Sequence, residues 1–409
     1  MLAHSDAISG PVLLALSGGG DSTALLHLLA ERMAGRVSAA IVDHAIRPGS
    51  EEDAARAAAA AEAQGVAVRV IGLSWRAGEK HNQAALRRAR HAALAAAAHD
   101  AGARVIALAH TADDQAETML MRAARTGEDR AQGMRVLAPS PVWPEGMGLT
   151  LWRPLLDASR AALRAYLNAR GATWIDDPSN DNLAYERIRA RRALTGAEAR
   201  RLLSLARDAD VRAAAREEAG ARWIAAHAVF DQGEVAFPHA AAHEEGAAPA
   251  LAILIAAVSG EGELPSMARA EALAARLGAD LRGATLGGAR IRRRGARIVL
   301  SRDPGAVLGR AGKAALAPFP LPLERAAIWD GRLALTAREP GWRAAPESAG
   351  AAIIVKAAQR LTLGEAEAAG ILAVSWLPAA RVRHLLAHSP GLEGVMLEEG
   401  VNGPARRLS

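Results

Sequence analysis

The residues with the clearest chemical potential lie between a predicted strand and a predicted helix near the start of the chain. The apolar run at 12–16 suits a buried parallel strand, and a turn with three consecutive glycines follows it. Such glycines let backbone N–H groups approach an anion closely, and Ser22 is predicted to cap the next helix. Because a helix N-terminus favours negative charge, a phosphate cradle is predicted. Its residues are Ser17, Gly18, Gly19, Gly20, Asp21 and Ser22.

The loop differs from a Walker P-loop, because it ends in Asp21-Ser22 and contains no lysine. It resembles the pyrophosphate-binding loop of the N-type ATP pyrophosphatase superfamily, whose signature is Ser-Gly-Gly-x-Asp-Ser. Members of that superfamily cleave ATP to AMP and pyrophosphate while adenylating a carbonyl oxygen. The alternative is an ordinary strand-to-helix turn in which the glycines only allow tight packing.

Strand-like and helix-like segments alternate after this loop, as they do in βαβ units. We therefore expect an α/β fold with a doubly wound, Rossmann-like parallel sheet, whose ligands bind at the carboxyl ends of the strands. The expected strands are 37–42, 66–73, 104–109 and 150–153, and the expected helices are 83–101, 113–125 and 159–170.

Acidic residues gather at the predicted start of helix 113–125. Asp113 and Asp114 lie in its first turn, and Glu117 follows one turn later. Together with Asp21 they are predicted to be catalytic, and Asp21, Asp113 and Glu117 are predicted to hold Mg²⁺, which prefers a few carboxylates plus phosphate oxygens. Simple helix capping is the alternative for the three acids of the helix.

Further polar residues follow the same strands. Asp43 and His44 are assigned to ATP binding, and His110 to the substrate side, although a lone histidine is more often a packing residue. Arg47 and the pair Arg87 and Arg90 are predicted to neutralise triphosphate or RNA charge; ordinary solvated arginines are the alternative.

The second half of the chain is expected to be helical from 195 to 277, and 287–302 then alternates like a β-hairpin rich in arginine. We expect Ile291 and Ile298 to pack inward, Arg294 to belong to the turn, and Arg292 and Arg297 to bind RNA. The net charge of +6 fits a nucleic-acid partner, but a biased genome composition explains it as well.

Taken in order, these segments resemble the tRNA(Ile)-lysidine synthetase family over about the first 195 residues. The motifs that carry the resemblance are the cradle, Asp43-His44 with Arg47, Arg87 and Arg90, His110 to Thr118, Gly133-Met134, Arg153-Pro154-Leu155-Leu156, and Asp177-Pro178-Ser179-Asn180 with Arg187 and Arg191. His91 departs from the family, which usually has tyrosine at this position. Ala109 and the loop at 126–132 also depart from it.

The resemblance implies a catalytic domain at 1–195, a mostly helical tRNA-binding domain at 196–305, and a small α+β module at 318–409. It also implies ligation of free lysine to the wobble cytidine of tRNA(Ile) with a CAU anticodon, with ATP and Mg²⁺ as cofactors. Arg187 and Arg191 join the predicted tRNA contacts, and a homodimer is left open.

The composition limits the alternatives. The chain has no cysteine, which argues against the tRNA thiolases that share the loop and excludes disulfides and thiolate metal sites. GMP- or NAD-synthetase-like enzymes and a non-catalytic tRNA-binding protein remain as alternatives. With no leader and no apolar run long enough to span a bilayer, we expect a cytoplasmic protein without membrane contact.

Overall fold

The computed structural model describes residues 2–45, 49–75, 82–176, 186–260, 263–279, 283–310, 314–347, 352–356 and 359–388. The chain divides into two compact units, Met1–Ala213 and Ala214–Ser409, and the boundary falls within the long helix α7 (Gly196–His227). Each unit is considered by itself.

The first unit contains a six-stranded sheet with the strand order β3-β2-β1-β4-β6-β5. Neighbouring strands run parallel except for β5, which pairs antiparallel with β6 at one edge. The predicted doubly wound α/β fold is confirmed. The strands are β1 (Val12–Ala15), β2 (Val37–Asp43), β3 (Ala67–Gly72), β4 (Val105–Ala107), β5 (Leu137–Pro139) and β6 (Thr150–Trp152).

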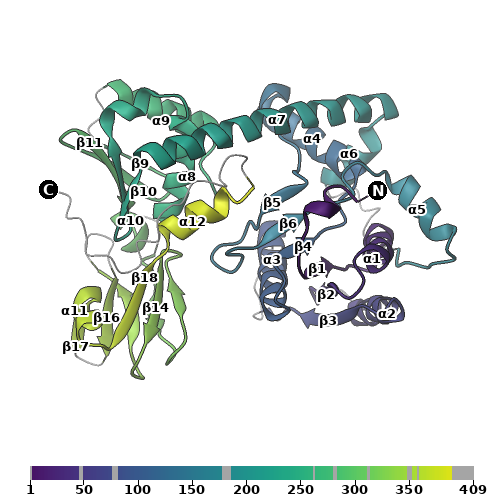
Figure 1. Cartoon of the computed structure of the whole chain (residues 1–409), viewed down its shortest axis with the longest axis horizontal. Helices are drawn as coiled ribbons and strands as arrows, with labels where there is room; N and C mark the ends of the chain where they lie inside the picture. Colours follow the sequence, from purple (N-terminus) through teal and green to yellow (C-terminus); the bar gives the residue numbers. More distant parts are fainter. Residues whose placement is uncertain are drawn as a thin grey trace. The chain divides into compact units, whose positions relative to one another are not determined.

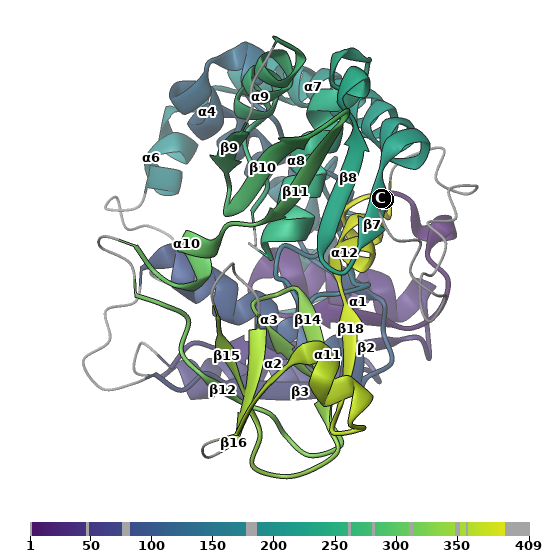
Figure 2. The same cartoon turned by 90° about the vertical axis from the view of Figure 1, so that its left-hand side faces the viewer.

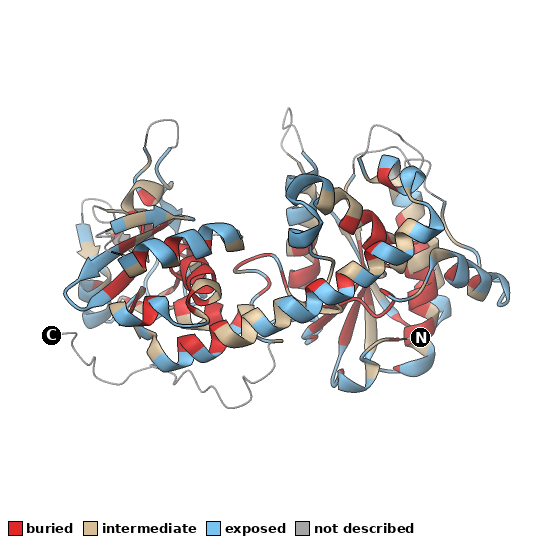
Figure 3. Ribbon diagram, turned by 90° about the horizontal axis from the view of Figure 1, so that it is seen from above, coloured by how far each residue is buried: buried red, intermediate tan, exposed pale blue. Residues whose placement is uncertain are grey.

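Helices cover both faces of this sheet. On β1, Val12 and Leu14 face a core shared with α1, α2 and α5, whereas Leu13 and Ala15 face a core shared with α3. Strands covered on both faces are apolar along their whole length, as β1 is, and Figure 3 shows the buried strands between exposed outer helix faces. The helices, which can be followed in Figure 1, are α1 (Gly20–Arg32), α2 (Ser50–Ala63), α3 (Gln83–Asp100), α4 (Ala112–Thr126), α5 (Arg160–Asn168) and α6 (Glu186–Ala193).

Side-chain caps fix where several of these helices begin. Thr111 and Asp114 form a capping box at α4, and Ser159 accepts a hydrogen bond from the amide of Ala162 at α5, as expected. Ser22 differs from its prediction. Helix α1 already begins at Gly20, so Ser22 lies inside the first turn and Gly19 occupies the N-cap position.

The second unit begins with the rest of α7 and a five-stranded antiparallel sheet, order β7-β8-β11-β10-β9, whose strands lie side by side in Figure 2. Between 195 and 277 the chain is mostly helical, and the short hairpin of β7 and β8, which the sequence did not predict, interrupts the helices. The elements are β7 (Val229–Asp231), β8 (Glu234–Pro238), α8 (Ala247–Ser259), α9 (Met267–Ala279), β9 (Gly283–Leu286), β10 (Ala289–Arg294) and β11 (Arg297–Arg302).

The remainder of the second unit is a small α+β region, as predicted. It has a four-stranded sheet, order β12-β15-β16-β17, and a three-stranded sheet, order β13-β14-β18. Its elements are α10 (Pro304–Val307), β12 (Phe319–Pro320), β13 (Ala327–Trp329), β14 (Leu333–Ala337), β15 (Arg343–Pro346), β16 (Ala352–Lys356), β17 (Gln359–Thr362), α11 (Leu363–Ala368), β18 (Leu372–Trp376) and α12 (Pro378–Leu385). Among the described helices, none has the length and apolar character needed to cross a membrane.

Candidate active site

The glycine-rich loop joins β1 to α1 and is held by hydrogen bonds between its own two serines. The hydroxyl of Ser22 accepts from the amide of Ser17 at 3.2 Å, lies 3.0 Å from the Ser17 hydroxyl, and donates to the carbonyl of Gly19 at 2.9 Å. Ser22 therefore shapes the loop instead of capping the helix. Because amides in the first turn of a helix lack intrahelical partners, this loop presents N–H groups at the carboxyl edge of the sheet.

Ile175, in the segment that follows α5, packs onto this loop. The amide of Ile175 donates to the carbonyl of Gly18 at 2.9 Å, and a Cβ atom placed on Gly18 would lie 2.6 Å from Cδ1 of Ile175. Gly18 also has φ of +80°, so both its backbone conformation and this close approach require glycine.

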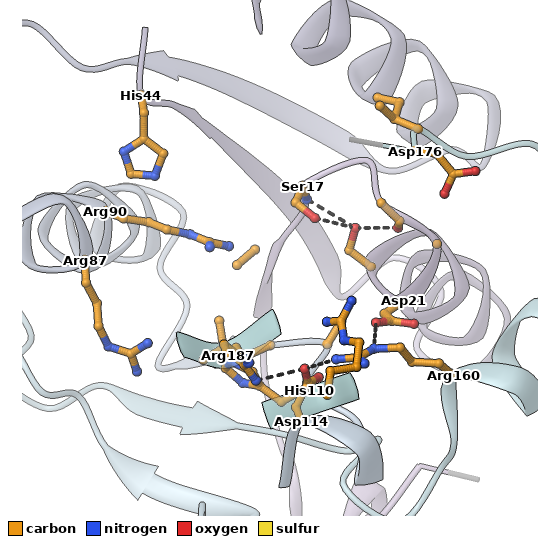
Figure 4. A pocket seen from close by; sticks show the side chains of 18 of the residues that line it. Ser17, Asp21, His44, Arg87, Arg90, His110, Asp114, Arg160, Asp176 and Arg187 are labelled. Atoms are coloured by element: carbon orange, nitrogen blue, oxygen red, sulfur yellow. Dashed lines mark hydrogen bonds and ion pairs between the residues drawn. The ribbon is translucent and has the colours of Figure 1, made fainter. Parts of the chain in front are cut away.

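The loop forms one wall of a cavity of about 860 Å³. Twelve predicted residues line it: Ser17, Gly19, Gly20, Asp21, Ser22, His44, Arg87, Arg90, His110, Asp114, Arg187 and Arg191. They come from the loop and the start of α1, from the residue after β2, from the segment between β4 and α4, and from α3, α4 and α6; Figure 4 labels several of them. Segments far apart in the sequence thus meet at the edge where parallel sheets bind ligands.

Four predicted residues of the first unit lie elsewhere. Gly18, Asp113, Glu117 and Asp43 do not line the cavity. Asp43 instead forms hydrogen bonds at the end of β2. The carboxylate of Asp43 accepts from the amide of Ala45 at 2.9 Å and from the hydroxyl of Ser50 at 3.2 Å. Arg47 and the segment 177–180 lie outside the described residues.

The acidic side of the cavity is an ion-pair cluster around Glu117. Its carboxylate is only 1% exposed and accepts hydrogen bonds from Arg160, Arg187 and Arg191 at 2.8 to 2.9 Å. Burial by itself would raise the pKa of Glu117, but hydrogen bonds from the three guanidinium groups outweigh burial and hold the pKa below its ordinary value. Glu117 is therefore an ionised partner of arginines.

Asp114 serves two purposes in this cluster. One oxygen accepts from the amide and hydroxyl of Thr111 in the capping box, and the other pairs with Arg160 and Arg187. Burial opposes its ionisation, but Arg160 and Arg187 prevail, so the pKa of Asp114 is lowered. The capping alternative is confirmed for Asp114, which also lines the cavity, and its catalytic role stays a prediction.

The predicted metal set is not assembled. Within the described parts of the chain, no three acidic or histidine side chains are close enough together to hold a metal ion. Both oxygens of Glu117 are engaged by arginines, and Oδ2 of Asp113 accepts the backbone amide of Arg160 at 2.9 Å. Glu117 is instead surrounded by arginines from α5 and α6, which the local spacing did not reveal, and its role as a metal ligand stays a prediction.

Asp21 faces the cavity from the first turn of α1. Partial burial raises its pKa, and the charge of Arg160 opposes that rise. Nε of Arg160 lies 3.4 Å from Oδ2 of Asp21. Figure 4 shows Arg160 between Asp21 and Asp114. Sequence reasoning missed Arg160, and its place at the start of a predicted helix, where a cation is unfavourable, was the available signal.

The other side of the cavity is basic and carries Arg87 and Arg90 of α3. No described carboxylate pairs with Arg87 or Arg90. Desolvation lowers the pKa of both, helped by the charge of Arg187 at Arg87 and by the charge of Arg87 at Arg90. Burial and the neighbouring arginine charges lower the pKa of His110 to about 3 and that of His91 to about 4. This side therefore presents neutral imidazoles and uncompensated guanidinium groups, as an anion site would.

A second loop is fixed against α4. The side chain of Gln115 accepts from the amide of Met134 at 2.6 Å and donates to its carbonyl at 2.8 Å. A Cβ atom on Gly133 would lie 2.7 Å from the Gln115 amide nitrogen, so the glycine allows this clamp. The predicted Gly133-Met134 motif therefore positions backbone beside the acidic helix.

The arginine-rich hairpin lies in the second unit. Arg294 pairs with Arg297 across the two strands, so the turn is Gly295-Ala296 and the expectation that Arg294 lies in the turn was wrong. Ile291 and Ile298 are fully buried, as predicted. Residues opposite one another share a face, which places Arg292 with Arg294 and Arg297 and leaves Arg293 on the face of Ile298.

Comparisons with known proteins agree with this geometry. An anion-binding loop at the carboxyl edge of a parallel sheet defines the class, and a family model described as a PP-loop domain matches residues 3–198. A tRNA(Ile)-lysidine synthase from Hyphomonas neptunium is 42% identical over 305 residues, covering 72% of this chain and 82% of the relative. One from Mesorhizobium japonicum is 34% identical over 96% of this chain and 84% of its own length. The chain belongs to the tRNA(Ile)-lysidine synthase family.

A U34-tRNA thiolase from Methanococcus maripaludis is similar in structure over 50% of this chain and 72% of its own. Its identity is 14% and its TM-score is 0.41.

Proposed function

We propose that the protein uses ATP to attach free lysine to the wobble cytidine of tRNA(Ile) with a CAU anticodon, giving lysidine, AMP and pyrophosphate. The observation that carries the proposal is the cavity lined by the PP-loop and by Arg87 and Arg90 of α3, which pair with no carboxylate among the described residues. It offers backbone N–H groups and guanidinium charge to a triphosphate, as an adenylating enzyme needs.

The proposed chemistry has two steps. The 2-carbonyl oxygen of the cytidine attacks the α-phosphorus of ATP, and pyrophosphate leaves. The amine of lysine then bonds to carbon 2, the carbon–oxygen bond breaks, AMP leaves, and the amine loses a proton. A carbonyl oxygen is a poor leaving group and AMP is a good one, so ATP cleavage makes the substitution possible.

The residues of the cavity are assigned to this chemistry by position. Ser17, Gly19 and Gly20 hold the phosphates through the loop, while Arg87 and Arg90 face the triphosphate or the anticodon phosphates from the other side. His110 is neutral near pH 7, so it would act as a hydrogen-bonding group and not as a cation. Its Nδ1 is buried and has no hydrogen-bond partner among the described residues.

Mg²⁺ is implied by the family and fits the site only in part. The carboxylate of Asp21 lines the cavity, whereas Glu117 is saturated by arginines. Because Mg²⁺ commonly binds through one or two carboxylates plus phosphate oxygens, Asp21, with Asp113 as a second predicted ligand, would hold it. When bound, the ion supplies positive charge to the departing pyrophosphate.

The tRNA is proposed to contact both units. In the second unit, Arg292 and Arg297 lie on the same face of the hairpin, and both are exposed. We assign this face to backbone phosphates and residues 196–305 to tRNA binding. A homodimer stays a prediction that light scattering can test.

The function is tested by incubating the protein with ATP, labelled lysine and a tRNA(Ile) transcript. We expect label in the anticodon only when ATP is present, and none in a transcript with uridine at the wobble position. Asp21→Asn should lose AMP formation while keeping its fold, because Asp21 lies at the cavity and outside the buried core. Transfer of label to the uridine transcript, or ATP cleavage without labelling, would overturn the proposal.

A further inference from the structure

Arg160 occupies a position that local helix stability does not explain. It is the first residue of α5, where the helix dipole disfavours a positive side chain, and Ser159 already caps this helix. Its side chain is 17% exposed, so the guanidinium group is also largely desolvated. A cation kept at such a place needs partners elsewhere.

Those partners are three carboxylates from two different helices. Nη1 donates to Glu117 at 2.9 Å, Nη2 pairs with Asp114, and Nε lies 3.4 Å from Asp21. Each nitrogen of the planar fork thus reaches a different acid. The carboxylates raise the pKa of Arg160 against the effect of burial, so its charge is retained.

The backbone around Arg160 is fixed as well. Its amide donates to Asp113 at 2.9 Å, and the amide of Ala112 donates to the carbonyl of Ala158 at 2.9 Å. The start of α5 is therefore joined to the start of α4 by two hydrogen bonds. These hydrogen bonds fix the backbone of Arg160 and so restrict where its guanidinium group can lie.

Asp21 depends on Arg160 in a way that the other acids do not. Arg187 and Arg191 of α6 also pair with the acids of α4, whereas Asp21 forms no second salt bridge with any residue that the structure describes. Losing Arg160 would remove the one salt bridge that Asp21 forms with a described residue and leave only the more distant charge of Arg164, whereas Glu117 would keep two arginine partners. The effect of the loss should therefore appear at the phosphate loop.

We propose that Arg160 is a positioning residue that holds Asp21 in a fixed place relative to the Asp114 and Glu117 pair. The guanidinium group thereby links the ATP half of the cavity to the α4 half. This inference rests on the proposed function, because its readout is the ATP-dependent half-reaction.

The test compares Arg160→Gln with Arg170→Gln. Arg170 also forms a salt bridge to α1, with Glu31 at 3.0 Å. It follows the end of α5 and, unlike Arg160, does not line the cavity. We expect tRNA-dependent pyrophosphate release, measured without lysine, to fall about 100-fold in Arg160→Gln, as for a misplaced reacting group. Arg170→Gln should stay close to wild type.

A second comparison separates positioning from general damage. Arg160→Lys keeps the charge but reaches fewer carboxylates, so it should recover part of the rate at saturating ATP. If Arg160 acts through Asp21, adding Arg160→Gln to Asp21→Asn should not weaken binding of a non-hydrolysable ATP analogue further. Additive losses would overturn the inference, as would equal rates for Arg160→Gln and Arg170→Gln.

Two further outcomes remain distinguishable. If wild-type protein releases no pyrophosphate with tRNA(Ile), the proposed function fails and the inference fails with it. If Arg160→Gln does not fold, as judged by circular dichroism, Arg160→Lys alone carries the test. A wild-type rate of pyrophosphate release in Arg160→Lys would show that the planar guanidinium group is not required and would overturn the inference.

Discussion

The amide of Ile175 and the carbonyl of Gly18 are 2.9 Å apart in a hydrogen bond that joins residues separated by most of the first unit. The Ile175 side chain packs against the same glycine. The phosphate loop is therefore held in place by the segment that follows α5. A change in the position of Ile175 should change the shape of the loop.

Gly18→Ala tests that support. The new Cβ would lie 2.6 Å from Ile175 and 3.0 Å from Ala57, in a backbone with φ of +80°. Gly35→Ala is the matched control, because Gly35 has φ of +75° and a Cβ atom added to it would meet no other atom within 4 Å. Each should lose about 1–2 kcal/mol for the left-handed conformation, and Gly18→Ala should lose more and bind ATP more weakly. If denaturant titration showed the same loss in the free energy of unfolding for both variants, the Ile175 side chain would have to move aside at little cost.

Glu117→Gln should be strongly destabilising. The substitution removes the buried carboxylate from three guanidinium groups and should lower the free energy of unfolding by about 3 kcal/mol. Glu128→Gln removes the partner of Arg201 at an exposed pair and should change stability little. Urea unfolding of both variants checks the contrast, and similar midpoints would contradict the buried-cluster account.

Asp113→Ala separates metal binding from helix capping. If Asp113 only accepts the hydrogen bond from the amide of Arg160 at the start of α5, Asp113→Ala should behave like Ser159→Ala, which removes the side-chain cap of α5. Each variant should then lose about 1 kcal/mol of unfolding free energy and keep its Mg²⁺ requirement. If Asp113 holds Mg²⁺, as the sequence predicts, Asp113→Ala alone should need more Mg²⁺ for half-maximal pyrophosphate release. A Mg²⁺ titration of the two variants decides between the roles.

His91 should make stability depend on acid pH. Burial and the charges of Arg87 and Arg90 lower its pKa to about 4 from an ordinary value near 6.5, so the unfolded chain binds a proton that the folded chain refuses. Stability from this residue is present above pH 6.5 and is lost as the pH falls toward 4. His91→Gln should flatten the fall in melting temperature over that range, while His99→Gln, exposed on the same helix, should leave it unchanged.

The hairpin should contribute to the salt dependence of tRNA binding. Removing one phosphate-contacting arginine reduces the slope of log affinity against log salt by ~0.7–0.9, so we expect this for Arg292→Ala and Arg297→Ala. Arg293→Ala is the control, because Arg293 lies opposite Ile298 on the other face. ATP binding should be unchanged in all three. Identical slopes for wild type and all variants would place the tRNA contacts elsewhere.

Much of the fold was predictable because its signals are local. The apolar strands, the glycine loop and the cap at Ser159 depend on residues close in sequence, and the structure confirms them. The hairpin at β7 and β8 was missed, since its short strands stand beside long helices of similar alanine-rich composition. The turn of the arginine-rich hairpin was displaced by one residue for a different reason, because the register of two strands is set by their pairing.

The sequence by itself determined which groups follow the strands at the carboxyl edge of the sheet, because the positions of strands and helices along the chain follow from local pattern. Only the tertiary structure decided what those groups do to one another. Arg160, Arg187 and Arg191 approach Glu117 from positions 43 to 74 residues away in the sequence and form ion pairs with its buried carboxylate. Charge and desolvation act through space, so the ionisation of Glu117, Asp114 and His110 is fixed by neighbours that sequence spacing does not show.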